Sequence, residues 1–186
     1  MSRIGFRNLD ELDPVVLSEL QTRLPLQVYG AIAHSEPALK GFLAMGNELG
    51  QHRLTKRIRE IIVLRMASLL ECGYELHQHR KFAEFVGLTK EEICLIEEGI
   101  DSALLNPEER AVLQMVSELT VGNVSEKTYK IVAHYFDNQQ MVEIVFIFGY
   151  YQLLEKFIET FQIEPESDGV ISKEAYAKRV NKWKKD

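Results

Sequence analysis

Residues 55–79 read TKRIREIIVLRMASLLECGYELHQH, and this stretch decides the fold class. Thr55 is a typical N-cap residue, and the apolar side chains after it recur at intervals of three and four, which predicts a long helix. Gly73 predicts a break or a bend, after which a second helix runs to Val86 and stops at Gly87. Two successive helices without an alternating strand pattern indicate an all-α protein.

Helix signals recur along the rest of the chain, whereas strand signals are almost absent. The pairs Thr89/Glu92 and Asp137/Gln140 are spaced as capping boxes. Asn106-Pro107 and Asp13-Pro14 combine an N-cap residue with a proline in the first helical position. We expect further helices over 14–22, 25–33, 36–49, 90–98, 107–121, from 126 onward, 138–161 and 172–184.

The composition predicts one globular domain over residues 1–186, made of N-terminal helices (1–53), a core (54–162) and a C-terminal extension helix (163–186). Apolar residues make up 46% and charged residues 27% of the chain, which is ordinary for a globular protein. The formal net charge of −6 argues against a nucleic-acid partner. Two cysteines are too few for a disulfide framework, and the N-terminus has no apolar signal region, so we expect a cytoplasmic protein.

The core contains a weak internal repeat. Residues 60–70 (EIIVLRMASLL) and 109–119 (ERAVLQMVSEL) align at an offset of 49, with six identities. We interpret them as two copies of one helical hairpin around a shared core, although coincidence between two amphipathic helices explains the match equally well. Between the matching ends, the first copy holds CGYELHQH (72–79), and the second holds the unreactive VGNVSEKT (121–128). Any chemistry is therefore expected in the first copy.

Cys72, Glu75 and His79 fall at i, i+3 and i+7 and lie on one face of the predicted helix. Glu75 and His79 are i,i+4 neighbours, so the carboxylate can orient the imidazole and raise its basicity, which suits a general acid/base. The alternative interpretation is structural: the same residues form a polar network between packed helices, in which each group has a hydrogen-bond partner.

These residues carry a resemblance to a known family. The runs LTKRIREIIVLR (54–65), ECGYELHQH (71–79) and GLTKEEI (87–93) resemble the carboxymuconolactone decarboxylase family, which includes the alkylhydroperoxidase D branch. The resemblance covers roughly residues 20–162. Within the family, the chain is similar to the longer YExxxH-type members. It implies an alkylhydroperoxidase D-like helical bundle that assembles as a homotrimer or a homohexamer.

The peroxidase branch matches this chain only in part. That branch has a glutamate twelve residues before the first cysteine of a CxxC pair, and a histidine four residues after the second cysteine. Glu60 and His79 match the glutamate and the histidine, and Cys72 matches the first cysteine. The second cysteine is Glu75 here and Tyr74 replaces a histidine, so a dithiol cycle within the motif is impossible.

Two catalytic interpretations stay open. The first is an acid/base enzyme acting on a small carboxylated or lactone substrate, in which His79 carries the proton, Glu75 orients it and Glu60 relays protons. Tyr74 then binds the substrate, and Arg57 or Arg65 holds its carboxylate. The second is a thiol-dependent hydroperoxidase with antioxidant activity through Cys72, which an external thiol recycles.

A non-catalytic, oligomeric binding protein is the third interpretation. The run at 141–154 is apolar nearly all round, so we expect it either to be fully buried or to form a subunit contact. It is too short to span a membrane. We expect no organic cofactor, because no glycine-rich phosphate loop occurs, and no metal, because no second Glu-x-x-His pair and no HExxH motif are present. The expected partners are a small-molecule substrate and further copies of the chain, not a membrane.

Overall fold

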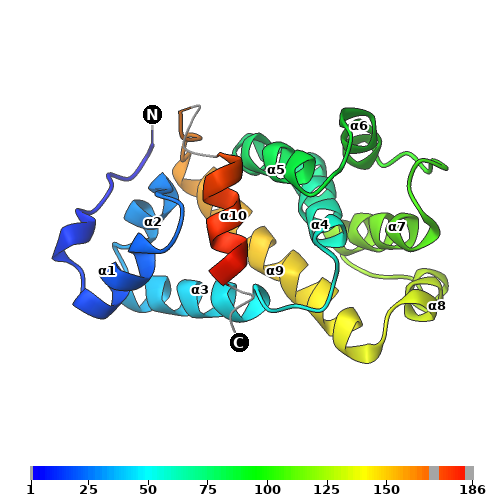
Figure 1. Ribbon diagram of the computed structural model, residues 1–186, viewed down its shortest axis with the longest axis horizontal. Helices are drawn as coiled ribbons and strands as arrows, with labels where there is room; N and C mark the ends of the chain where they lie inside the picture. The colour runs from blue at the N-terminus through cyan, green and yellow to red at the C-terminus, as the bar shows by residue number, and fades with distance from the viewer. Residues whose placement is uncertain (1, 168–171, 183–186) are drawn as a thin grey trace. The chain divides into compact units, whose positions relative to one another are not determined.

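The structure is a computed structural model that describes residues 2–167 and 172–182. Every regular element among these residues is a helix (Figure 1), which confirms the all-α prediction. The elements are η1 (Leu9–Glu11), α1 (Pro14–Gln21), α2 (Gln27–Ile32), α3 (Glu36–Leu49), α4 (Lys56–Leu69), α5 (Gly73–Phe85), α6 (Lys90–Glu98), α7 (Pro107–Val121), α8 (Glu126–Tyr135), α9 (Asn138–Phe161) and α10 (Lys173–Lys182).

Several helices begin or end at the residues that the capping signals predict. The hydroxyl of Thr55 accepts a hydrogen bond from the backbone N–H of Ile58 at 3.2 Å, which caps α4. Thr89 and Glu92 form the reciprocal capping box of α6, with distances of 3.2 and 2.7 Å. Gly99 ends α6 with φ of 73°, a conformation in which a side chain would be strained.

Two boundaries differ from the prediction. The helix expected from Pro25 starts at Gln27, because Leu26 is still extended with ψ of 137° and serves as the N-cap residue. The short helix η1 was missed, since Asn8 caps it through its side chain without any apolar periodicity to indicate a helix. The predicted end of the last helix near Lys184 lies outside the described residues.

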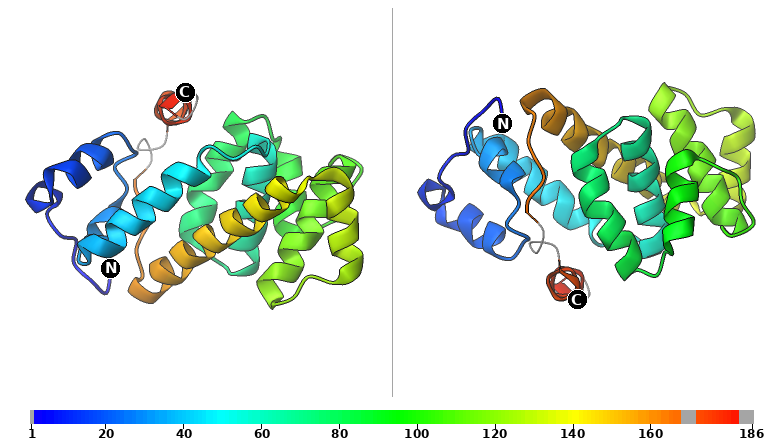
Figure 2. Two further views of the ribbon diagram at one scale, coloured as in Figure 1. Left: turned by 90° about the horizontal axis from the view of Figure 1, so that it is seen from below. Right: turned by 90° about the horizontal axis from the view of Figure 1, so that it is seen from above.

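The chain divides into two compact units, residues 52–155 and residues 1–51 with 156–186. The last residues of α9, from Lys156 onward, belong to the same unit as residues 1–51. The unit of residues 52–155 is built around α4, which packs against α5, α6 and α7, while α7 packs in turn against α8 (Figure 1). Figure 2 shows α7 and α8 side by side in both views.

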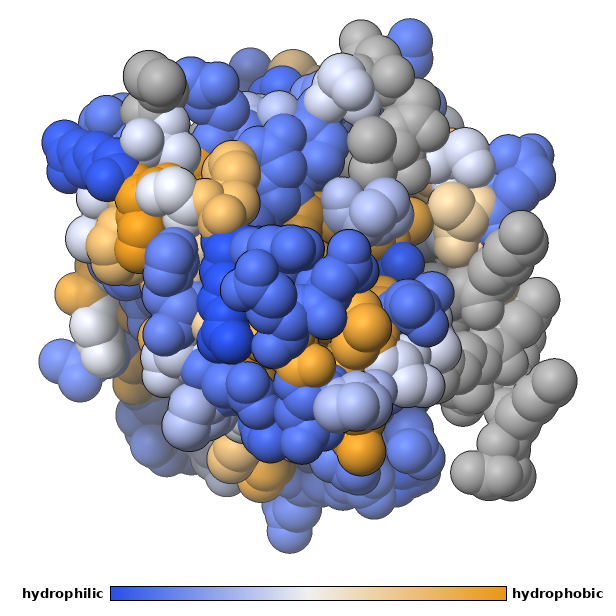
Figure 3. Space-filling view, turned by 90° about the vertical axis from the view of Figure 1, so that its left-hand side faces the viewer, coloured by the Kyte–Doolittle hydropathy of each residue, from blue (hydrophilic) through white to orange (hydrophobic). Residues whose placement is uncertain are grey.

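The other unit contains α1, α2, α3 and α10. The carboxylate of Glu166 accepts a hydrogen bond from the backbone N–H of Gln27 at 2.6 Å, and the carbonyl of Phe161 accepts one from Arg3 at 2.8 Å. These bonds attach the C-terminal segment to the N-terminal helices. On the side of α1 and α2 the surface is mostly hydrophilic with small, separate hydrophobic patches (Figure 3). Among the described residues, no helix has both the length and the apolar character needed to cross a bilayer.

Candidate active site

Two of the predicted acid/base residues, Glu75 and His79, lie on α5. Cys72 is the N-cap residue of this helix, and Glu75 and His79 follow at one and two turns. All three are buried, with exposed fractions of 0%, 1% and 2%. Their side chains therefore face the interior of the unit, where an unpaired charge would be costly.

Glu60 on α4 completes the group around the imidazole ring. Nδ1 of His79 lies 2.6 Å from Oε2 of Glu60, and Nε2 of His79 lies 3.3 Å from Oε2 of Glu75. Glu60 is fully buried. The structure thus brings together the three residues predicted to handle protons, with one carboxylate at each nitrogen of the ring.

The two carboxylates determine the protonation state of the ring. Burial alone would lower the pKa of His79, but the negative charge of Glu60 and the hydrogen bonds to Glu60 and Glu75 raise it to about 10. At neutral pH, His79 is therefore an imidazolium that donates one N–H to each carboxylate. In this state it can give a proton but cannot accept one.

Arg59 and Tyr151 extend the polar group, and sequence reasoning missed both. Nη2 of Arg59 donates a hydrogen bond of 2.8 Å to the hydroxyl of Tyr151, and Nε of Arg59 lies 3.7 Å from Oε1 of Glu60. The ring of Tyr151 meets the ring of His79 edge-on, with centroids 5.0 Å apart. Two cations, Arg59 and His79, thus face two carboxylates, Glu60 and Glu75, which balances the buried charge.

The edge of this group holds a second histidine that the sequence did not single out. Nδ1 of His52 is buried and has no hydrogen-bond partner among the described residues. Burial and the charge of Arg59 lower the pKa of His52, so this imidazole is neutral at pH 7. His52 lies in the connection before α4, where no periodic pattern could have indicated its direction.

Tyr74 is buried at the start of α5. It is the neighbour of Glu75 in sequence, so its side chain leaves the helix about 100° away from the carboxylate. Cys72 precedes Glu75 by one turn, and its thiol is free of any disulfide. Cys94, the other cysteine, is exposed on α6.

Arg57 and Arg65 form hydrogen bonds with residues outside the His79 group. The guanidinium of Arg57 binds Glu109 at 2.8 Å, Glu92 at 2.7 Å and the carbonyl of Gly87 at 2.9 Å. Arg65 donates to Ser117 at 2.8 Å and to the carbonyl of Glu97 at 2.7 Å. These bonds tie α4 to α6 and α7, which argues for a structural role rather than for binding a substrate carboxylate.

The segment that aligns with residues 60–79 at an offset of 49 has no histidine at the position of His79. At the offset of 49, Glu109 stands in the place of Glu60 and Thr128 in the place of His79. Glu109 binds Arg57, whereas Thr128 donates a hydrogen bond of 2.6 Å to Glu118. Hydrogen bonds from Thr128, Gln114 and Ser125 lower the pKa of Glu118 to about 2. An open, mostly polar hollow of about 500 Å³ lies here, but its acidic residue fastens the start of α8.

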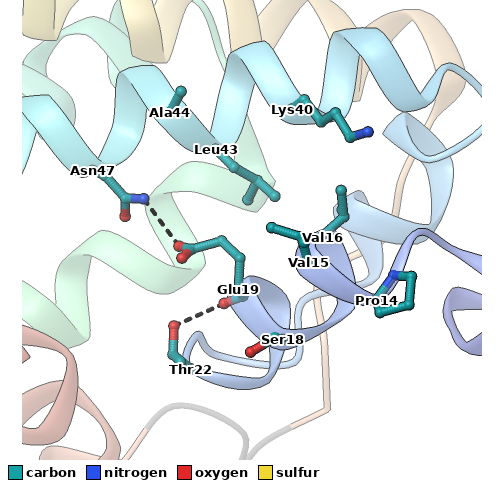
Figure 4. Close-up of a pocket in the computed structure, with 10 residues that line it drawn as sticks. All are labelled: Pro14, Val15, Val16, Ser18, Glu19, Thr22, Lys40, Leu43, Ala44 and Asn47. Carbon is teal, nitrogen blue, oxygen red and sulfur yellow. Dashed lines mark hydrogen bonds between the residues drawn. The ribbon is translucent and has the colours of Figure 1, made fainter.

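A larger groove lies between α1 and α3 in the other unit and has a volume of about 630 Å³ (Figure 4). Val15, Val16 and Leu43 make it apolar, and Glu19 at one end accepts a hydrogen bond of 3.0 Å from Asn47. Lys40 at its rim pairs with Glu36 at 3.1 Å. The groove contains none of the predicted site residues, and its ionisable residues Glu19 and Lys40 are engaged with Asn47 and Glu36.

Comparison with solved structures places the fold in a known class. An alkylhydroperoxidase AhpD core from Ralstonia eutropha, described as a peroxidase-related protein, is 19% identical, with a TM-score of 0.81 over 92% of this chain and 96% of that chain. The debrominase Bmp8 is 14% identical, with a TM-score of 0.73 over 98% of this chain and 96% of that chain. The protein is therefore an all-α helical bundle with an AhpD-like fold.

The sequence comparisons find similarity to a known family over part of the chain. Residues 36–118, less than half of the chain, match the model of the carboxymuconolactone decarboxylase family. The matched range includes α4, α5 and α6 and therefore the whole Glu60, Glu75 and His79 group. An uncharacterized protein of Bacillus subtilis, YdfG, is 24% identical over 112 residues, which are 59% of this chain and 76% of that protein.

Proposed function

We propose that this protein is an acid/base enzyme in which Glu60, His79 and Glu75 form a proton relay acting on a small carboxylated or lactone substrate. The observation that carries the proposal is the position of one buried imidazole between two carboxylates, 2.6 and 3.3 Å away. A structural ion pair needs only one of them. The second carboxylate provides a route by which a proton can leave the ring.

The geometry favours a division of roles that differs from the sequence-based hypothesis. Both nitrogens of His79 are occupied, so the ring has no atom left to contact a substrate. Oε1 of Glu75, in contrast, is buried and makes no hydrogen bond with any described residue. In the proposed mechanism Glu75 contacts the substrate, His79 supplies the proton, and Glu60 holds the ring.

Decarboxylation of a lactone is one reaction that the proposed relay would support. Loss of carbon dioxide leaves the electron pair of the broken carbon–carbon bond conjugated with the lactone carbonyl. A proton from Nε2 of His79, passed through Glu75, then quenches this pair on carbon. Glu60 stays ionised and keeps the Nδ1–H bond, and solvent restores the proton after the product has left.

The burial of the site also bears on the mechanism. His79 and Glu75 are only 2% and 1% exposed, so a substrate reaches them only when the side chains that cover them move. In a site that closes again around the substrate, water is excluded and the charges of the relay act at low dielectric.

Turnover of a carboxymuconolactone, measured as released carbon dioxide, tests the proposal. We expect Glu75→Gln and His79→Gln each to lower kcat about 10²–10⁴-fold, the range of general acid–base catalysis. His77→Gln is the matched control, because His77 lies on the same helix and is only half-buried. Activity of His79→Gln at the level of the wild type would refute the relay.

A thiol-dependent hydroperoxidase is the second candidate, favoured by the position of the buried Cys72 thiol one turn before Glu75. The thiolate would attack the peroxide and release an alcohol, leaving a sulfenic acid that two molecules of an external thiol reduce back. Consumption of tert-butyl hydroperoxide with dithiothreitol, abolished in Cys72→Ser but retained in Cys94→Ser, would establish this function. The acid/base proposal instead predicts that Cys72→Ser leaves lactone turnover largely intact.

A further inference from the structure

Within the unit of residues 52–155, helix α9 has one apolar face that is buried and a second apolar face that is exposed to solvent. Ile144, Ile147 and Tyr151 are buried on the inner face. The apolar run at 141–154 was expected to be either fully buried or a subunit contact, and the structure shows that only one side of it is buried.

The outer face is a continuous stripe. Gly149 is exposed, and the exposed fractions of the four apolar side chains around it lie between 42% and 59%. These positions recur at three- and four-residue intervals, which places them on one face over three turns. We call this surface the α9 stripe, and it consists of Val142, Val145, Phe146, Gly149, Gln152 and Leu153.

We propose that the α9 stripe is the contact by which two copies of this chain associate around a two-fold axis that passes near Gly149. The stripe is nearly symmetric about this glycine, with Val145 four residues before it and Leu153 four residues after it. In an antiparallel crossing centred on Gly149, Val145 of one copy packs on Leu153 of the other, and the reverse contact follows by symmetry.

Gly149 suits the centre of such a crossing. A Cβ atom built at this position would have no neighbour within 4 Å, so the space above the glycine is open. The absence of a side chain lets a second helix approach closely, and the bulkier residues on either side fill the space around the crossing. This pattern fits a copy of the same helix better than an irregular partner.

The net charge of the chain and the exposed area of the α9 stripe both fit a second copy of the chain as the partner. The chain carries a net charge of −6, so two copies repel unless the contact avoids charged residues, and the α9 stripe contains none. The exposed fractions of its four apolar side chains correspond to roughly 320–420 Å² in each copy, taking about 150–200 Å² for a fully exposed side chain. This is about half of the roughly 800 Å² that each partner buries in a standard interface, which fits the apolar centre of a contact with a polar rim.

The family resemblance implies a trimer or a hexamer. A two-fold contact alone produces a dimer, and together with a separate three-fold contact it produces a hexamer. The proposed contact is therefore compatible with a hexamer but not with an isolated trimer.

Sedimentation velocity over a range of concentrations tests the contact. We expect the wild type to sediment as a dimer or an even multiple, and Phe146→Glu to weaken the association at least about 30-fold. Val121→Glu is the matched control, because Val121 is 82% exposed and lies outside the stripe. A wild type that is monomeric at every concentration, or an oligomer that Phe146→Glu does not affect, would overturn the proposal.

Cross-linking gives the geometry independently of folding effects. In a Cys94→Ser background, Gly149→Cys should form a disulfide between copies under mild oxidation, because facing Cα atoms at a close helix crossing lie within the range that a disulfide spans. Val121→Cys in the same background should not. Equal cross-linking at both positions, or none at 149, would contradict the two-fold crossing.

Discussion

Nδ1 of His79 lies 2.6 Å from Oε2 of Glu60, a residue on the neighbouring helix and nineteen positions earlier in the chain. Together with Glu75 on the other side of the ring, this contact makes His79 a buried cation at neutral pH. The contact between Glu60 and His79 therefore depends on the packing of α4 against α5. A change in that packing would alter the protonation state of His79 as well as the position of its ring.

The hydroxyl of Tyr151 should contribute measurably to stability. It accepts a buried hydrogen bond of 2.8 Å from Arg59, which Tyr151→Phe removes while it keeps the aromatic ring beside His79. We expect this variant to lose about 1–3 kcal/mol in the free energy of unfolding, measured by urea denaturation. Tyr129→Phe, at a position that is 48% exposed, should change it by less than about 0.5 kcal/mol.

The His79 cluster should make stability depend on alkaline pH. The pKa of His79 is raised from 6.5 to about 10 by folding, so the folded state holds the proton more tightly than the unfolded state. Its contribution is complete below pH 6.5 and declines by about 1.4 kcal/mol per pH unit as the pH rises toward 10. The difference in unfolding free energy between the wild type and His79→Gln should shrink over this range, and a difference independent of pH would refute the assignment.

Arg57 should act on stability rather than on substrate binding. Arg57→Met leaves Glu109, which is 3% exposed, without its cation, so we expect a loss of about 2–4 kcal/mol. Arg80→Met is the matched control, because Arg80 pairs with Glu97 at the surface and is 52% exposed, and it should cost less than about 1 kcal/mol. A stable Arg57→Met variant with a raised KM would instead support the substrate-binding role expected from the sequence.

Gly99 should be sensitive to any side chain. Its φ of 73° is unfavourable for other residues, and a Cβ atom there would meet the guanidinium of Arg65, which Ser117 holds in place. We expect Gly99→Ala to lower the midpoint of thermal unfolding, at a cost of about 1–3 kcal/mol. Gly41→Ala, in the exposed interior of α3 with open space around it, should instead leave stability unchanged or raise it.

Local signals predicted most of the fold. Thr55, Asn106 and Thr89 cap the helices that follow them, and Gly99 ends α6 as expected, because capping depends on a few neighbouring residues. The shared face of Glu75 and His79 was also predictable, since it follows from the helical repeat alone.

Contacts between distant segments were not predictable in the same way. Three arginines lie on α4, and only Arg59 faces the His79 group, whereas Arg57 and Arg65 were the expected candidates. Every residue from Ile58 to Leu64 is buried, so periodicity could not distinguish one face of α4 from another. Tyr151 comes from α9, more than seventy residues after His79, and no local pattern indicates that their rings meet.

The protonation state of His79 tests the central claim most directly. Nitrogen-15 NMR of the histidine side chains, with His79 assigned by comparison with His79→Gln, reports whether one or both ring nitrogens carry a proton. We predict that both nitrogens of His79 are protonated at pH 7.5 and that the ring loses a proton only near pH 10. A ring that is neutral at pH 7.5 and titrates close to 6.5 would contradict the doubly bonded imidazolium and the relay built on it.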